Sequence, residues 1–168
     1  VSLVEDTSVR VEDLPAYMDD FARLLAAHGK DSVYHAHIGT GELHIRPVLN
    51  LKDPGDVELF RTIGLETAQL VKKYRGSLSV EHGDGRLRGE FIPLILGEEN
   101  YKLLKELKAA WDPENILKPG KIVDTPLMNT FLRYEPGALS PRLETIYDFS
   151  STEGIVRAAE KCNGSGDC

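Results

Sequence analysis

The sequence predicts an α+β fold in which helices cover one face of an antiparallel sheet. Two long segments, residues 14–29 and 53–76, carry apolar side chains at helical spacing. Three shorter segments, residues 1–9, 34–45 and 77–81, alternate apolar and polar residues, which is typical of strands with one buried face. Because residues 34–45 can form a hairpin, the order is β-α-β-β-α-β, which is the ferredoxin-like, or split βαβ, arrangement.

Both helices have recognisable ends. The first is expected to stop at Gly29, because glycine commonly follows the last helical turn. The second is expected to begin at Asp53-Pro54, where an N-cap residue precedes a proline in the first turn, and to end at Gly76. The faces expected to pack on the sheet carry Leu14, Tyr17, Met18, Phe21, Leu24 and Leu25 in the first helix and Phe60, Ile63, Thr67, Leu70, Val71 and Tyr74 in the second.

The hairpin of residues 34–45 has a Gly-Thr-Gly bend at its centre. If its loop is Thr40-Gly41, His37 lies directly opposite His44, and such residues have Cβ atoms about 4.5–5.5 Å apart. Two imidazoles at that separation can bind one metal ion. A three-residue loop would break this pairing, and Thr-Gly is a poorer two-residue turn than Asn-Gly. In the alternative interpretation, the two histidines are ordinary polar residues on the open face of a sheet.

A carboxylate follows in the strand expected at residues 77–81. There Glu81 faces away from Leu78 and Val80, at the end of the strand, where functional side chains are often displayed. Two imidazoles and one carboxylate with open positions are typical of a catalytic metal site. The core face of the sheet is expected to carry Tyr34, Ala36, Ile38, Leu43, Ile45, Leu78 and Val80, which leaves the two histidines on the other face.

Beyond the sheet, the chain changes character. Tyr101, Leu104, Leu107 and Trp111 are in phase and predict a C-terminal helix. From residue 123 onward the pattern loses periodicity, apart from a short helical run at residues 152–161. We therefore expect one domain over residues 1–122 and an extended linker over 123–161, followed by a cysteine-containing segment at 162–168.

Composition limits the classes of function. The chain has 168 residues, 41% of them hydrophobic, which is enough for one domain with a substantial core. Its formal net charge of −7 argues against nucleic acid or an anionic membrane as partner. No apolar run is long enough to span a membrane or form a signal peptide, so a soluble, cytoplasmic protein is expected. The only cysteines, Cys162 and Cys168, lie in the last seven residues, so no disulfide framework is expected.

Three ordered motifs, HIGTGELH at residues 37–44, SVEHGDG at 79–85 and WDPENILKPGKI at 111–122, resemble the C-terminal domain of FAD-linked oxidases. These enzymes belong to the vanillyl-alcohol oxidase superfamily and include D-lactate dehydrogenase, the glycolate oxidase flavin subunit and D-2-hydroxyglutarate dehydrogenase. The resemblance covers residues 4–122. The tail segments MNTFLRY, YDF and CNGSGDC, beginning at residues 128, 147 and 162, are similar to the bacterial subgroup in which the flavin half is fused to an iron–sulfur half.

The resemblance implies specific roles. It makes His37, His44 and Glu81 ligands of a divalent metal, zinc or manganese, and His82 the catalytic base. A metal-chelated 2-hydroxy acid would have a lowered hydroxyl pKa, and His82 would take that proton while hydride passes to the flavin. Thr40 and Glu42 stand where the family often has Asp and Asn, which puts any substrate contact by that Asn in doubt. Asp84 likewise stands where the family commonly has an apolar residue.

The resemblance also implies a substrate and partners outside this chain. Arg86 and Arg88 are candidate substrate-binding residues, because a guanidinium matches a second carboxylate, although a solvated basic turn is the alternative. This favours D-2-hydroxyglutarate over D-lactate or glycolate. FAD would be bound mainly by a missing domain of the same polypeptide, since no glycine-rich dinucleotide turn follows a strand here. Cys162 and Cys168 would belong to a missing iron–sulfur domain, because a cluster needs about four thiolates. The fragment alone is therefore expected to be inactive.

A second interpretation comes from another class of protein. The same residues could form a non-catalytic ferredoxin-like module that binds a metal or small ligand for regulation. An FAD-binding region in the same polypeptide would separate the two interpretations.

Overall fold

The computed structural model describes all residues except 1, 133–135, 137–142 and 163–168. The chain forms two compact units, Val1–Pro136 and Gly137–Cys168. The sheet and all the candidate site residues except the cysteines belong to the first unit. Cys162 is exposed in the second unit, and Cys168 lies outside the described residues.

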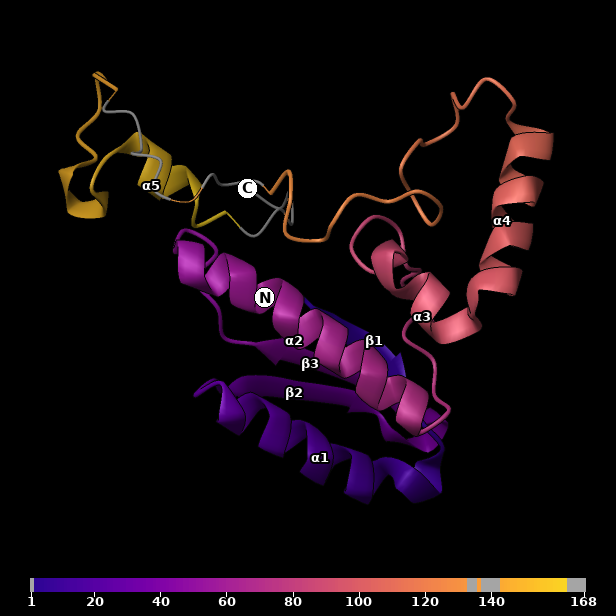
Figure 1. Cartoon of the computed structure of the whole chain (residues 1–168). Coiled ribbons are helices and arrows are strands. Elements are labelled where there is room, and N and C mark those ends of the chain that lie inside the picture. The colour runs from indigo at the N-terminus through magenta and orange to yellow at the C-terminus, as the bar shows by residue number, and fades with distance from the viewer. Residues whose placement is uncertain (1, 133–135, 137–142, 163–168) are drawn as a thin grey trace. The chain divides into compact units, whose positions relative to one another are not determined.

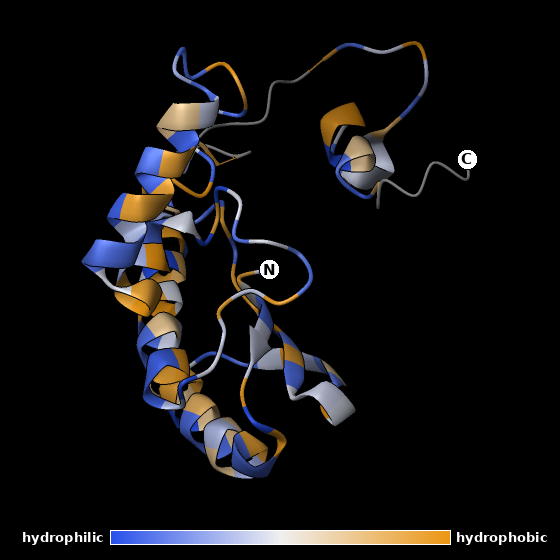
Figure 2. Cartoon of the chain, turned by 90° about the vertical axis from the view of Figure 1, so that its right-hand side faces the viewer, coloured by the Kyte–Doolittle hydropathy of each residue, from blue (hydrophilic) through white to orange (hydrophobic). Residues whose placement is uncertain are grey.

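A three-stranded antiparallel sheet and two long helices make up the centre of the first unit (Figure 1). The strands β1 (Val4–Ser8), β2 (Ser32–His37) and β3 (Glu42–Pro47) are arranged in the order β1-β3-β2. The helices α1 (Leu14–Ala27) and α2 (Pro54–Lys73) lie on the same side of the strands, as Figure 2 shows. The predicted α+β class, with helices on one face of an antiparallel sheet, is confirmed.

The helix predictions are also confirmed, because local signals fix the helix ends. Asp53 caps α2, its side chain accepting a hydrogen bond from the Asp56 amide at 3.1 Å. Gly29, just beyond α1, has a φ of 62°, a conformation that favours glycine. The remaining elements are the 3₁₀ turns η1 (Val11–Asp13), η2 (Ile38–Thr40), η3 (Gly89–Phe91) and η4 (Ser150–Thr152) and the helices α3 (Ile92–Leu96), α4 (Glu98–Trp111) and α5 (Ile155–Ala159).

The core lies between the two helices and β3, the central strand. Leu43 and Ile45 of β3 are 6% and 1% exposed. The prediction that Tyr34, Ile38 and Val80 share this core was wrong, since they are 50%, 65% and 47% exposed. Tyr34 lies in the edge strand β2, which the helices cover less completely, and the other two residues lie outside the strands altogether. The buried cluster comprises Leu3, Val9, Leu14, Tyr17, Phe21, Leu25, Leu43, Ile45, Phe60, Ile63, Ala68, Val71, Leu78, Phe91 and Met128.

The prediction of a fourth strand over residues 77–81 was wrong as well. Ser77 makes a single antiparallel bridge with Ser8, through N–H to O bonds of 2.9 and 2.8 Å. Beyond it the amides of residues 80–82 donate to the side chain of Asp6 instead of to a neighbouring strand. A buried carboxylate therefore replaces the strand ladder at this edge of the sheet.

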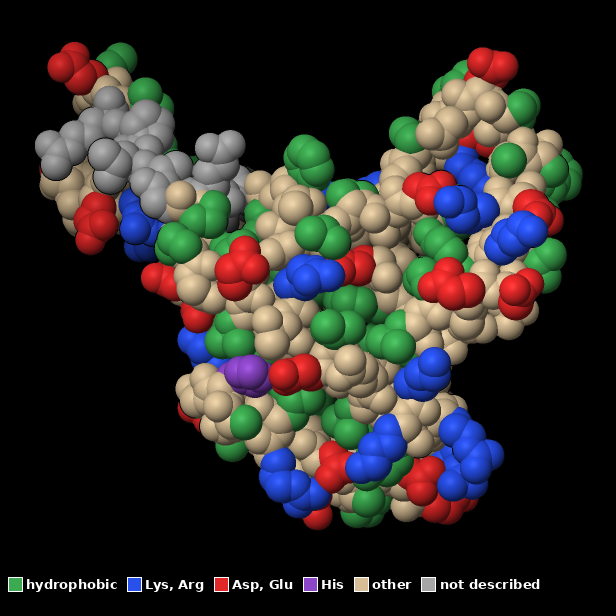
Figure 3. All heavy atoms as spheres, in the orientation of Figure 1, with side chains coloured by type: hydrophobic (Ala, Val, Ile, Leu, Met, Phe, Trp, Pro, Cys, Tyr) green, Lys and Arg blue, Asp and Glu red, His purple; other side chains and the backbone are tan. Residues whose placement is uncertain are grey.

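Charges of both signs are interspersed on the visible surface. Figure 3 shows Lys and Arg side chains alternating with Asp and Glu side chains over this face, without one continuous basic patch. None of the helices in the described ranges is long and apolar enough to cross a membrane.

Asp20 links the two long helices. Its carboxylate accepts hydrogen bonds from Lys73 Nζ at 2.6 Å and from Tyr74 Oη at 2.8 Å, and Arg23 also pairs with it. The Lys73 ammonium, the Tyr74 hydroxyl and the Arg23 guanidinium together hold the pKa of Asp20 well below its ordinary value of 3.8.

Replacing Asp20 with asparagine is expected to make stability less sensitive to acid. Because the pKa of Asp20 is lower in the folded state, its contribution is present at neutral pH and is lost as the pH falls below about 4 towards the folded-state value. The melting temperature, followed by circular dichroism, should therefore fall less in the variant than in the wild type between about pH 5 and pH 2. Asp19→Asn, at an exposed neighbouring position, is the matched control. Equal pH profiles for Asp20→Asn and the wild type would contradict the prediction.

Candidate active site

The hairpin brings its histidines together by a different register from the one predicted. His37 is opposite Glu42, and His44 is opposite His35, so the predicted direct pairing of His37 with His44 was wrong. The connection is a longer turn built on η2 and closed by Gly41, whose φ is 75°. A Cβ at Gly41 would lie 1.9 Å from the Val9 carbonyl oxygen, so close packing against the chain after β1 requires glycine here. His37 and His44 are diagonal neighbours on one face, still within reach of each other.

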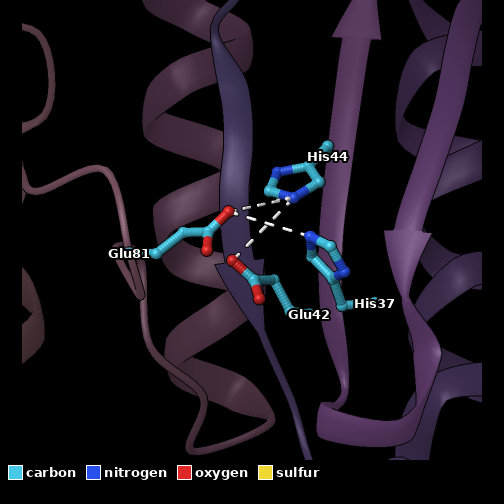
Figure 4. A group of neighbouring side chains, drawn as sticks. All are labelled: His37, Glu42, His44 and Glu81. Carbon is cyan, nitrogen blue, oxygen red and sulfur yellow. Dashed lines mark ion pairs between the residues drawn. The ribbon is translucent and has the colours of Figure 1, made fainter.

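Four side chains converge on one point (Figure 4). His37, Glu42 and His44 come from the hairpin and Glu81 from the loop after the Ser77 bridge, and one donor atom of each lies within 4.8 Å of all the others. Glu81 Oε1 is 3.6 Å from His44 Nε2 and 3.8 Å from His37 Nε2. The structure thus groups the three predicted ligands and adds a fourth acidic residue.

The protonation of His44 is set by a backbone group. Its Nδ1 donates a short hydrogen bond to the Glu5 carbonyl oxygen, which can only accept. Nδ1 therefore carries the proton of the neutral ring, and the lone pair of Nε2 faces the cluster. The contact depends on a β-bulge in β1, where Glu5 and Asp6 together lie opposite the single residue His44.

Asp6, the other residue of this bulge, holds the loop that carries Glu81. Its fully buried carboxylate accepts hydrogen bonds from the amides of Val80, Glu81 and His82 at 2.9–3.1 Å. It also accepts from the Ser79 hydroxyl at 2.8 Å. Burial alone would raise the pKa of Asp6, but these hydrogen bonds, with the Glu81 amide first, lower it overall. An ionised Asp6 therefore fixes the backbone from which Glu81 and His82 project.

His82 lies at the edge of the cluster and is outside the group of four. Its Nε2 is 3.2 Å from Glu81 Oε1, and its ring stacks on that of His44 with centroids 5.2 Å apart. Glu81 and His82 lie in a loop and not at the end of the predicted strand, so strand alternation does not orient them. The side chain of His82 is 43% exposed, so a proton could be exchanged with a bound molecule or with water.

The two arginines proposed as substrate-binding residues have partners within the chain. The side chain of Arg88 is 6% exposed and donates to Asp6 at 3.2 Å and to the Gly83 carbonyl at 2.6 Å. Arg86 is partly exposed and donates to the carbonyls of Thr130 and Phe131. Arg88 therefore stabilises the loop from within, whereas Arg86 retains accessible surface.

Asp84, between Gly83 and Gly85, also has a shifted pKa. Burial raises the pKa of this carboxyl, with Arg88 opposing the shift and Asp6 adding to it. Asp84 is not a member of the group of four.

Sequence reasoning missed Glu42 and Asp6. Glu42 could have been found, because it precedes His44 by two residues in a strand and must share its face. No local signal marked Asp6, since its partners are more than 70 residues away in the sequence. His35, whose ring stacks on His44 at a centroid distance of 5.7 Å, was also missed.

The donor set fits a divalent metal. Imidazole nitrogens and carboxylate oxygens are ligands that zinc and manganese both accept. Glu42 Oε1 is buried and has no hydrogen-bond partner among the described residues, which is the condition expected of a ligand atom. His37 and His44, with Glu81 and Glu42, are therefore the residues that could hold such an ion.

Comparison with known proteins identifies the family. Residues 1–122 match the family model described as FAD linked oxidases, C-terminal domain. The D-2-hydroxyglutarate dehydrogenase of Escherichia coli (strain K12) is 36% identical over 100% of this chain and 16% of its own length. The enzyme of the same name from Pseudomonas putida is 40% identical over 98% of this chain and 16% of its own length. The glycolate oxidase subunit GlcD of Bacillus subtilis (strain 168) is 26% identical over 72% of this chain and 26% of its own length.

The chain thus spans about 16% of the two D-2-hydroxyglutarate dehydrogenases. The four-residue cluster lies inside the matched region. The chain belongs to the family of FAD-linked oxidases, whose C-terminal domain model matches residues 1–122.

Proposed function

We propose that this chain is the substrate- and metal-binding part of a flavin-dependent dehydrogenase that oxidises a D-2-hydroxy acid to the 2-oxo acid. The observation that carries the proposal is the convergence of His37, His44 and Glu81 beside His82 in a member of the FAD-linked oxidase family. The alternative of a non-catalytic regulatory module has no support from these relatives, which carry the names of enzymes.

The roles follow from the chemistry of the side chains. A divalent metal, when bound, would lower the pKa of the substrate hydroxyl, and FAD would accept the hydride from C2. His82 would take the hydroxyl proton as general base. We assign the proton to Nε2, because Nδ1 lies on the side of Glu5, 4.0 Å from its carboxylate, and Nε2 lies on the side of Glu81. Asp6 would hold the His82 backbone in place during the transfer.

D-2-hydroxyglutarate is the proposed substrate. Relatives with that name match this chain at up to 40% identity, above the 26% of the glycolate oxidase subunit. Its second carboxylate needs a cationic partner, and Arg86 is the more available candidate because Arg88 is buried against Asp6. D-lactate and glycolate are the alternative substrates.

We also propose that the electrons continue from FAD to an iron–sulfur region of the same polypeptide. The matches to the E. coli and P. putida enzymes run through the tail, covering 100% and 98% of the chain. In contrast, the match to the Stutzerimonas stutzeri enzyme covers 70%. The match through the tail supports residues 123–161 as a linker before a cluster region that begins with Cys162 and Cys168.

Replacing His44 with alanine is expected to abolish stoichiometric zinc or manganese uptake by the full-length protein. His44 is buried and fixed by Glu5, so its loss removes the best-ordered donor. Metal content per polypeptide, measured by elemental analysis after expression and dialysis, tests this. His28→Ala is the matched control, because His28 pairs with Glu66 at 2.7 Å outside the cluster. Normal metal content in His44→Ala would place the metal elsewhere and defeat the proposed site.

A further inference from the structure

Glu42 is the one member of the cluster whose burial has no explanation within the protein. The residue is 5% exposed, and its Oε1 has no hydrogen-bond partner among the described residues. The nearest ring nitrogen, His44 Nε2, is 3.9 Å away, beyond hydrogen-bonding distance. A buried carboxylate oxygen without a partner is disfavoured, so Glu42 Oε1 implies a missing cation or donor.

No ring nitrogen in the described part of the chain lies within hydrogen-bonding distance of Glu42 Oε1. The hydrogen bond from His44 Nδ1 to the Glu5 carbonyl turns Nε2 of the same ring towards the cluster. Glu81 Oε1, the third atom of the group, is itself an anion. The possible ligand atoms of the four side chains therefore lie around one centre, as Figure 4 shows.

We propose that Glu42 is a fourth protein ligand, so that the site binds a divalent cation through two imidazole nitrogens and two carboxylate oxygens. This inference rests on the proposed metal site and extends it. The two carboxylates balance the charge of a divalent cation. Four protein ligands would fill a tetrahedral zinc site and leave no position for substrate. An octahedral cation such as Mn²⁺ would keep two positions, which suffice for the carboxylate and hydroxyl oxygens of a 2-hydroxy acid.

Metal titration of the full-length protein tests this assignment without relying on activity. Protein stripped with a chelator is titrated with MnCl₂, and free Mn²⁺ is read from its electron paramagnetic resonance signal. Wild type is expected to bind one ion, and Glu42→Gln to bind it at least about 100-fold more weakly, beyond the usual effect of losing a residue that only supports a ligand. Glu81→Gln is the positive control. Glu66→Gln, which removes the carboxylate of the His28 pair outside the cluster, is expected to bind as wild type does.

Glu42→Asp separates ligation from charge. It keeps the negative charge but withdraws the oxygen by one methylene, so a ligand role predicts a loss of at least about 10-fold. Wild-type affinity in Glu42→Asp or Glu42→Gln, with weakened binding in Glu81→Gln, would overturn the assignment of Glu42 and leave the three-ligand site intact. Absence of any binding by the wild type would overturn the metal site itself.

Thermal melting of the metal-free variants shows whether weaker metal binding results from loss of the folded structure. Because Glu42 Oε1 is buried without a hydrogen-bond partner among the described residues, metal-free Glu42→Gln is expected to melt at or above the temperature of the metal-free wild type. Saturating Mn²⁺ should then raise the midpoint of the wild type more than that of the variant. A metal-free variant that melts well below the metal-free wild type would show that Glu42 serves the fold, and would overturn the ligand role.

Discussion

Replacing His82 with alanine is expected to slow the reduction of flavin by D-2-hydroxyglutarate about 10²–10⁴-fold in the full-length protein, the usual contribution of a positioned general base. The metal should stay bound, because His82 lies outside the group of four donors. Flavin absorbance followed by anaerobic stopped flow measures the step directly. The loss should show in the limiting rate more than in the substrate dependence, since His82 acts on the proton and not on the carboxylates.

His28→Ala is the control for this experiment, because that histidine is paired with Glu66 away from the cluster. Near-normal flavin reduction in His82→Ala would remove His82 from the mechanism. Loss of metal in the same variant would make it a ligand instead of a base.

Asp6→Asn is expected to destabilise the protein by about 3–5 kcal/mol, the usual cost of breaking a buried ion pair. Arg88 would keep its charge in a buried site without its carboxylate partner. Oδ2 of Asp6 accepts most of the hydrogen bonds, and Oδ1 accepts the one from the Glu81 amide. If the oxygen of the asparagine side chain takes the place of Oδ2, its NH₂ group takes the place of Oδ1 and faces the N–H of Glu81. Two donors then face each other, and no hydrogen bond forms. The variant should therefore lose metal affinity as well as stability.

Urea unfolding of Asp6→Asn, beside the double variant Asp6→Asn/Arg88→Met, measures this effect. Removing the uncompensated guanidinium should recover part of the lost free energy of unfolding, because replacing a whole buried pair is far less costly than breaking it. A single variant within about 1 kcal/mol of the wild type, the range of a surface pair, would contradict the role given to Asp6.

The helices could be predicted from the sequence because their signals are local. The apolar spacing of α1 and α2, the Asp53 cap and the Gly29 stop all act within a few residues of each other. The register of the hairpin, in contrast, depends on a contact outside the hairpin. Gly41 closes a longer turn because the backbone packs against Val9, a contact that no pattern within the hairpin records.

The same contrast applies to the site. His37, His44 and Glu81 could be proposed from residue type and motif. The observed pairing places His37 opposite Glu42, two residues from His44, so both histidines still lie on one face of the hairpin. The strand predicted around Glu81 failed because Asp6, far away in the sequence, takes the amide hydrogens that a neighbouring strand would need. Contacts between distant segments therefore explain the errors in the hairpin register and in the fourth strand, and the chemistry of single side chains explains why the three ligands could be proposed.

The bulge in β1 has a consequence for mutational tolerance. Position 5 serves His44 through its main-chain carbonyl, which almost any residue provides, whereas position 6 serves the Glu81 loop through its own carboxylate. In a deep mutational scan of the full-length protein, these adjacent positions should behave in opposite ways. Most substitutions of Glu5 should preserve the tautomer of His44, whereas almost every substitution of Asp6 should impair the protein. Two adjacent residues of one strand should therefore differ sharply in the substitutions that they tolerate.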